Sequence, residues 1–224
     1  MTEINTPPQS PDKGAERQRV NSMFLNQYRG DAVVVPIRLG ATEITRAYRK
    51  HFDGVSRSLF YIRYYCAALN NTNMEQEILN GVIALLDQAA QAMEHKNEVA
   101  DNLLKEIEVT IKKGVNQTNI NAFVIDPLAN RYLKLIAAAD DLARKYRALW
   151  MAMAIDDKQK TQAMNETVNV LRQVHSKSTQ ISLGLRDRVS PKQSKVDDTG
   201  INNEAELAGN DEFQDDLEIE GENV

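Results

Sequence analysis

The sequence of 224 residues has one cysteine, 10 glycines and no apolar run long enough to cross a membrane. A membrane-spanning helix needs about 20 apolar residues, so we expect no transmembrane segment. The polar, proline-bearing start of the chain also lacks the apolar core of a signal peptide. A lone cysteine, Cys66, cannot form an internal disulfide, and its apolar surroundings in the sequence predict a packed small side chain. These absences favour a cytoplasmic protein.

The sequence also lacks the motifs of the common enzyme and cofactor classes. It has no glycine-rich phosphate loop, no nucleophile elbow and no cysteine–histidine signature. The three histidines, His51, His95 and His175, lie far apart and do not have the spacing of metal ligands. Asp140 and Asp141 are neighbours in a predicted helix, so their side chains point in different directions and make a poor catalytic pair. We therefore expect no catalysis, no metal and no other cofactor.

The net charge of −5 hides an uneven distribution that matters for a polyanionic partner. Residues 196–224 contain eleven acidic residues and no Lys or Arg, and residues 66–111 are also acidic. Residues 13–65 carry ten basic and four acidic side chains, and residues 112–195 carry fifteen and seven. Two basic segments that could face DNA are therefore separated by an acidic segment and followed by an acidic tail.

Both ends of the chain lack helical or strand periodicity and are predicted to be disordered. Residues 1–20 form a basic arm, and residues 190–224 form the acidic tail. The tail could mimic DNA and compete for a basic face, could contact RNA polymerase, or could keep a dimer in solution. Solubility is the default role, because a strongly charged segment opposes association.

The pattern between these ends predicts three segments. Residues 21–70 form a strand–helix–helix unit, residues 71–113 are helical, and residues 114–189 form a second, extended strand–helix–helix unit. In the first unit, Val33–Leu39 is a β-rich run in which Pro36 allows only an edge strand or a two-stranded ribbon. Gly54 should then separate two helices, over residues 42–52 and 56–69, that begin at the capping residues Thr42 and Ser56.

The middle segment has helical periodicity on both sides of a polar patch, Glu94–Glu98. One helix of about 40 residues would be about 60 Å long. We therefore favour a helical hairpin with its corner at the polar patch, with a single long helix as the alternative.

The third segment contains the clearest helix boundary in the chain. After the strand Asn119–Asp126, Asp126 is a favoured N-cap and Pro127 a favoured first helical residue. The helix that follows has an apolar stripe that steps by four and three residues from Leu128 to Met153. Such a stripe should face a core or a partner helix. A further helix should start at Asp156.

The second strand carries residue types that read DNA bases. Alternation places Asn119, Asn121 and Phe123 on one face and the strand's aliphatic residues on the other. Paired with its copy in a two-fold dimer, the strand would form an antiparallel ribbon whose polar face could enter a major groove, where Asn can bond adenine. Lys112 and Lys113 would then contact phosphates. The alternative is a linker that contains a buried strand.

The first strand and the helices after it offer a secondary basic surface, which consists of Arg38, Arg46, Arg49, Lys50 and Arg57. Arg38 is the base-reading candidate on that strand. A helix start at Ser56 would add free backbone N–H groups for a phosphate. The alternative is a solvated basic face beside a strand packed on a helical bundle.

Several short segments of the sequence resemble the AcaB-like proteins, which are encoded on conjugative plasmids and integrating conjugative elements. These segments are Asp-Pro-Leu-Ala-Asn-Arg-Tyr-Leu at 126–133, Ala-Asp-Asp-Leu at 139–142, Leu-Trp at 149–150 and Ala-Ile-Asp-Asp at 154–157. The resemblance covers roughly residues 30–186 and consists of hydrophobic patterns rather than catalytic motifs. It implies a ribbon-helix-helix regulator that binds promoter DNA as a dimer and activates transfer genes.

The AcaB-like pattern is centred on the second unit, so Asn119–Asp126 ranks above Val33–Leu39 as the DNA ribbon. The helix after it is about twice the usual ribbon-helix-helix length, which implies an extended version of that fold. We expect a mainly α, dimeric protein with a short β-ribbon, in which Asn119 and Asn121 read bases and Arg131 joins the lysines on phosphates. The rival hypothesis is a helical scaffold of a conjugation system that docks partners through the stripe and the acidic segment 66–111.

Overall fold

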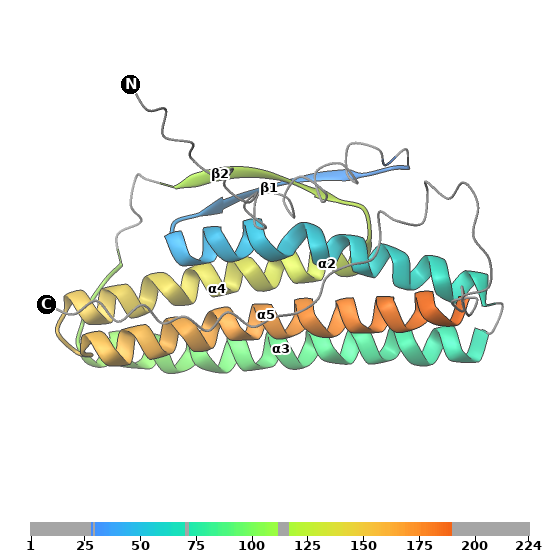
Figure 1. Cartoon of the computed structure of the whole chain (residues 1–224). Coiled ribbons are helices and arrows are strands. Elements are labelled where there is room, and N and C mark those ends of the chain that lie inside the picture. Colours follow the sequence, from blue (N-terminus) through green and yellow to red (C-terminus); the bar gives the residue numbers. More distant parts are fainter. Residues whose placement is uncertain (1–27, 29, 70–71, 112–116, 190–224) are drawn as a thin grey trace, which may run out of the picture. The chain divides into compact units, whose positions relative to one another are not determined.

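The computed structural model describes Tyr28 and residues 30–69, 72–111 and 117–189. These residues form four helices and two strands, in the order β1 (Val33–Leu39), α2 (Thr42–Ala68), α3 (Thr72–Glu106), β2 (Thr118–Val124), α4 (Pro127–Met151) and α5 (Asp157–Val189). Figure 1 shows the two strands lying over α2 and α4, with α3 and α5 farther from the strands. The prediction of a mainly α fold with a short β-ribbon is confirmed. The predicted arm and acidic tail lie outside the described residues.

The apolar stripe of α4 forms the centre of the core. It packs against α2, α3 and α5, and most of its side chains are buried: Leu128, Tyr132, Leu135, Ala139, Leu142 and Leu149. Burial of one such large apolar side chain contributes about 1.5–3 kcal/mol to folding. The scaffold hypothesis required this stripe to be a free docking surface. The stripe is not free, because this chain's own helices cover it.

The predicted break at Gly54 is wrong, because α2 runs unbroken from Thr42 to Ala68. Gly54 is buried against α5, and a Cβ at this position would lie 2.8 Å from Nε2 of His175. The glycine therefore allows the close approach of a neighbouring side chain and does not end a helix. Ser56 is buried inside α2, so the predicted phosphate site at a helix start there is also wrong.

The favoured hairpin is also wrong, since α3 is a single helix of 35 residues. Two residues of the expected corner instead contact neighbouring helices. Nζ of Lys96 lies 2.5 Å from Oε2 of Glu166 in α5. The amide of Asn97 donates to the carbonyl oxygen of Ala138 in α4, at 3.3 Å. These polar residues join α3 to the bundle, and no turn is needed to accommodate them.

The glycines inside the helices test whether the packing of α2 against α5 requires glycine at position 54. Nothing lies within 4 Å of the Cβ that alanine would add at Gly81 or Gly184. Because glycine disfavours a helix interior, Gly81→Ala and Gly184→Ala should each raise the free energy of unfolding by about 0.5–1 kcal/mol. Gly54→Ala should lower it, because its Cβ collides with His175. Urea denaturation measures all three, and a stabilising Gly54→Ala would contradict the packing described here.

The two strands form one antiparallel ribbon within the chain. Val33 lies opposite Val124, and Leu39 lies opposite Thr118. The prediction that β2 pairs with its own copy across a dimer axis is therefore wrong, because β1 takes that place. The structure removes the unpaired strand as a reason for a dimer, and the dimer stays a prediction that rests on the resemblance.

The predicted alternation of faces along β2 is confirmed, and β1 alternates in the same way from Val34 to Leu39. Leu39, Ala122 and Val124 are buried on the face toward the helices, and Ile37 and Ile120 are half-buried there. The ribbon is therefore attached to the bundle by one apolar face, and its other face is exposed.

Candidate nucleic-acid interface

The exposed face of the ribbon, called here the outer face, is built from three cross-strand pairs. Arg38 lies opposite Asn119, Pro36 opposite Asn121, and Val34 opposite Phe123, and all six residues are exposed. Val34 and Phe123 are each 50% exposed. The outer face is consequently basic and polar at one end and apolar at the other.

This register joins two candidate sites that are far apart in the sequence. Arg38 belonged to the secondary surface, whereas Asn119, Asn121 and Phe123 belonged to the primary one. Because β1 and β2 pair within the chain, Arg38 and Asn119 become direct neighbours across the ribbon. Both strands therefore contribute to one face, and the question of which strand alone forms the ribbon disappears.

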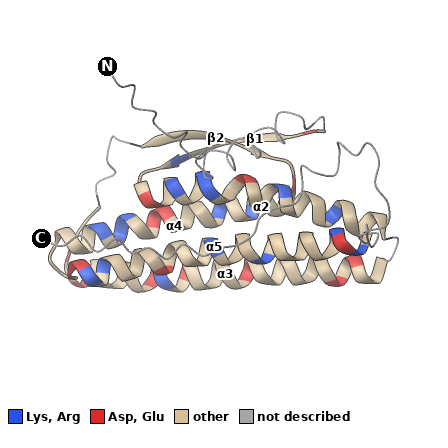
Figure 2. Cartoon of the chain, viewed as in Figure 1, with Lys and Arg blue, Asp and Glu red and all other residues tan. Residues whose placement is uncertain are grey.

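A second basic surface lies on α2, which begins at Thr42, just after β1 ends. Arg46, Arg49, Lys50 and Arg57 recur at helical spacing on one side of α2, called here the α2 basic face. The first three are exposed and Arg57 is half-buried. Figure 2 shows Lys and Arg gathered along α2 below the ribbon.

Arg38 and the four cations of the α2 basic face supply positive charge near the ribbon. Within the part of the chain that the structure describes, none of these five side chains has a carboxylate within ion-pair distance. Their charges are therefore not neutralised locally and remain available to an anionic partner.

Arg131, by contrast, is not brought to the outer face. Its guanidinium lies 3.2 Å from Oδ1 of Asp87, so Arg131 forms an ion pair between α4 and α3. The prediction that Arg131 holds a phosphate beside the ribbon does not fit this position. Lys112 and Lys113 lie outside the described residues.

Asp140 fixes one end of the ribbon to the bundle. The N-cap of α2, Ala41, has no side chain that can cap the helix. Oδ1 of Asp140 in α4 takes that role and accepts hydrogen bonds from the backbone N–H groups of Gly40, at 2.9 Å, and Ala41, at 2.7 Å. Arg144 completes the cluster at 3.0 Å from Oδ2 of the fully buried Asp140 carboxylate. The turn between β1 and α2 is thereby held against α4.

Asp126 fixes the corresponding end of β2. Its Oδ1 accepts a hydrogen bond from the backbone N–H of Leu128 at 2.7 Å, which confirms the predicted N-cap with Pro127 as the first helical residue. Its Oδ2 forms an ion pair with Arg63 of α2. One buried carboxylate therefore both caps α4 and connects the end of the ribbon to α2.

The anchoring role of Asp140 was not predicted, although the sequence contains a signal for it. Asp140 lies four residues after Ile136 and three residues before Ala143, both of which widen the apolar stripe of α4. A carboxylate at a buried helix position requires partners, because burial of an unpaired charge is costly. That requirement predicts an anchor, but it does not identify Gly40 and Ala41 as the groups that are bound.

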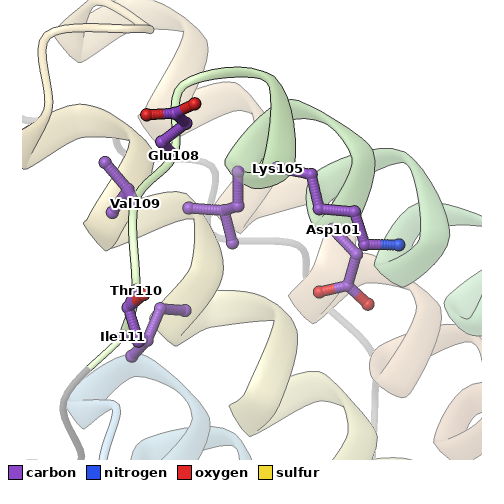
Figure 3. Close-up of a pocket in the computed structure, with 7 residues that line it drawn as sticks. Asp101, Lys105, Glu108, Val109, Thr110 and Ile111 are labelled. Atoms are coloured by element: carbon purple, nitrogen blue, oxygen red, sulfur yellow. The ribbon is translucent and has the colours of Figure 1, made fainter.

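The hollow at the end of α3 does not form a comparable site. Asp101, Lys105 and Glu108 are among the residues that line it, and Asp101 is already paired with Lys145 at 2.7 Å. Figure 3 shows the carboxylates of Asp101 and Glu108 pointing in different directions, so no polar groups converge on one position. Among the described residues no three His, Cys, Asp or Glu side chains cluster as metal ligands. No helix in the described ranges is long and apolar enough to cross a membrane.

The arrangement of helices and strands is similar to that of a solved structure, the crystal structure of selenomethionine-containing AcaB from uropathogenic E. coli. The TM-score is 0.69, and the match covers 72% of this chain and 84% of the AcaB chain at 16% sequence identity. The resemblance to AcaB is thereby confirmed at the level of the fold. No protein-family model and no curated protein matches the chain.

Proposed function

We propose that this protein is a sequence-specific, double-stranded DNA-binding regulator of transcription that activates conjugative transfer genes. The observation that carries the proposal is the outer face, an exposed two-stranded ribbon with Arg38 and Asn119 in register. A two-stranded ribbon fits the major groove of B-DNA. The likeness of the fold to AcaB supports a regulatory role, since the AcaB-like proteins that the sequence resembles are regulators of transfer genes.

The residues of the outer face match the groups that distinguish base pairs in the major groove. Arginine bonds O6 and N7 of guanine, asparagine bonds N6 and N7 of adenine, and apolar side chains contact the methyl group of thymine. Arg38, Asn119 and Asn121 would supply the polar contacts, and Val34 and Phe123 the apolar ones. From Arg38 to Val34 the strand advances about 13 Å, which corresponds to about four base pairs.

The α2 basic face would supply the contacts that orient the protein on the duplex. Phosphate contacts fix register and contribute a salt-dependent affinity that does not depend on sequence. The proposed function involves no catalysis. Its proposed partners are promoter DNA, a second copy of the chain and RNA polymerase. The rival scaffold role is weakened by the burial of the α4 stripe, which would have been its main docking surface.

The test begins with duplexes selected by the purified protein from a randomised library. Their affinity, measured by fluorescence anisotropy at about 50 and 200 mM salt, should exceed that of a scrambled duplex. The affinity should also fall steeply as salt rises, since phosphate contacts release counterions. Absence of a complex with any selected duplex at about 50 mM salt would refute the proposal.

A single substitution tests the role of the outer face in specificity. Asn121→Ala should reduce the preference for the selected duplex over a scrambled one by about 1–3 kcal/mol, because it removes a base contact. Affinity for scrambled DNA should hardly change. Asn102→Ala, at an exposed position of α3, is the matched control and should leave both affinities unchanged. An equal loss for both duplexes would instead assign Asn121 to the phosphate backbone.

A further inference from the structure

The contact between α2 and α5 contains two histidines that have no role in the proposed DNA interface. The two helices lie side by side and run in the same direction, with His51 beside His175 and Ser58 beside Thr179 (Figure 1). The ring centroids of the two imidazoles are 4.9 Å apart. Two titratable side chains therefore meet at the seam between these helices.

One histidine of the pair, His51, is buried, whereas His175 is half-buried. His51 is 5% exposed, and its Nδ1 is buried without a hydrogen-bond partner. On the other side of the pair, Nε2 of His175 approaches Gly54 so closely that a Cβ there would be 2.8 Å away. The glycine in the middle of α2 is thus part of the same arrangement, because it makes room for the second imidazole.

The charges around His51 oppose its protonation. Lys50 on the same helix and Arg172 on α5 are both basic, and no described carboxylate forms an ion pair with His51. From α4, the titratable side chain of Tyr132 points toward this part of α5. Its hydroxyl donates to the carbonyl oxygen of Leu171, which lies one turn before His175. Burial first, and then the neighbouring His175 and the two cations, lower the pKa of His51 to about 3.

The contacts that α2 and α5 make beside the histidines involve small and hydroxyl-bearing residues: Gly54 lies against His175, and the hydroxyl oxygens of Ser58 and Thr179 are 3.4 Å apart. Ser178 already donates to the carbonyl of Val174 within its own helix at 2.7 Å. Small side chains allow close approach of the helices but bury little apolar area. The contacts directly beside the histidines therefore contribute little apolar burial to oppose the effect of an added positive charge.

We infer that the seam between α2 and α5 is an acid-sensitive latch, which opens locally when His51 takes up a proton. The closed form binds that proton poorly, whereas the opened form exposes His51 to water, where its pKa has the ordinary value of about 6.5. Acid therefore shifts the equilibrium toward the opened form as the pH falls from about 6.5 toward 3. This inference does not depend on DNA binding.

The size of the effect follows from linkage. At pH 5, the protonated form of an exposed imidazole of ordinary pKa is about 30 times as abundant as the neutral form. His51 in the closed form stays neutral at this pH. The opening equilibrium should therefore increase at least about 30-fold between pH 7.5 and pH 5.

Hydrogen exchange of the full chain, corrected for the intrinsic pH dependence of amide exchange, measures this opening. In the wild type, protection of peptides around His51 and His175 should fall at least about 30-fold at pH 5, with a smaller loss in α3. In His51→Gln, the loss of protection at pH 5 should be about 30-fold smaller than in the wild type. His95→Gln, at an exposed position of α3, should behave like the wild type. An unchanged acid response in His51→Gln, or an equal loss in every helix, would overturn the inference.

The imidazole resonances of the wild-type protein give a second measurement that requires no substitution. His51 should remain neutral in the folded form at pH 5. Titration of His51 in the folded form near pH 6.5 would also overturn the inference. Since neither experiment contains DNA, failure of the latch and failure of the proposed DNA binding can be distinguished.

Discussion

Replacement of Asp140 by alanine is expected to lower the free energy of unfolding by about 3–5 kcal/mol, measured by urea denaturation. The carboxylate is fully buried and is bonded to two backbone N–H groups and to Arg144. Its removal leaves those N–H groups without an acceptor and Arg144 without its buried partner, and both losses are costly.

The neighbouring residue provides the control for this substitution. Asp141 also pairs with Arg144, but its side chain is 59% exposed. Asp141→Asn should change the free energy of unfolding by less than about 0.5 kcal/mol, since exposed ion pairs contribute little. Asp140→Asn, which keeps one acceptor oxygen, should fall between the two. Equal effects of the substitutions at 140 and 141 would contradict the anchoring role of Asp140.

The second large effect concerns the α2 basic face and follows from the proposed DNA binding. The triple variant Arg46→Gln, Arg49→Gln, Lys50→Gln should bind DNA about 1,000-fold more weakly at about 50 mM salt, or about tenfold per phosphate contact. The slope of log affinity against log salt should become shallower by about 2.7, because each lost contact contributes about 0.9. Anisotropy titrations on selected and scrambled duplexes should show equal losses.

A variant with the same change in net charge separates a local effect from a general one. Lys105, Lys158 and Lys177 are exposed and belong to α3 and α5, away from the ribbon. Their combined replacement by Gln should leave the salt slope nearly unchanged. If both triple variants lose affinity to the same extent, overall charge governs binding and the α2 basic face has no special role.

Local signals in the sequence predicted the elements that depend on neighbouring residues. Both strands were located from the sequence: Val33–Leu39 has the predicted bounds, and the strand predicted at Asn119–Asp126 runs from Thr118 to Val124. Alternation also identified the buried face of β2, because side chains in a strand alternate between faces. Asp126 and Pro127 marked the start of α4 correctly, because capping is completed within the first turn. The apolar stripe of α4 identified the helix that forms the centre of the core.

The errors arose where a residue's role depends on a distant neighbour. In the sequence Gly54 indicates a helix break, whereas in the fold it makes room for His175 of α5. The polar patch around Lys96 likewise indicates a corner, whereas Lys96 forms an ion pair with Glu166 of α5. Such residues look alike in the sequence whether they end an element or accommodate another one, so local patterns cannot separate the two cases.

The sequence by itself determined where the strands and most helix ends lie and which faces of the strands and of α4 are apolar. Only the tertiary structure decided that β1 pairs with β2, so that Arg38 stands opposite Asn119 on a single face. It also decided that Asp140 caps a helix in another part of the chain. The physical reason is that periodicity and capping are local, whereas strand pairing and buried-charge partners depend on which distant segments the folded core brings together.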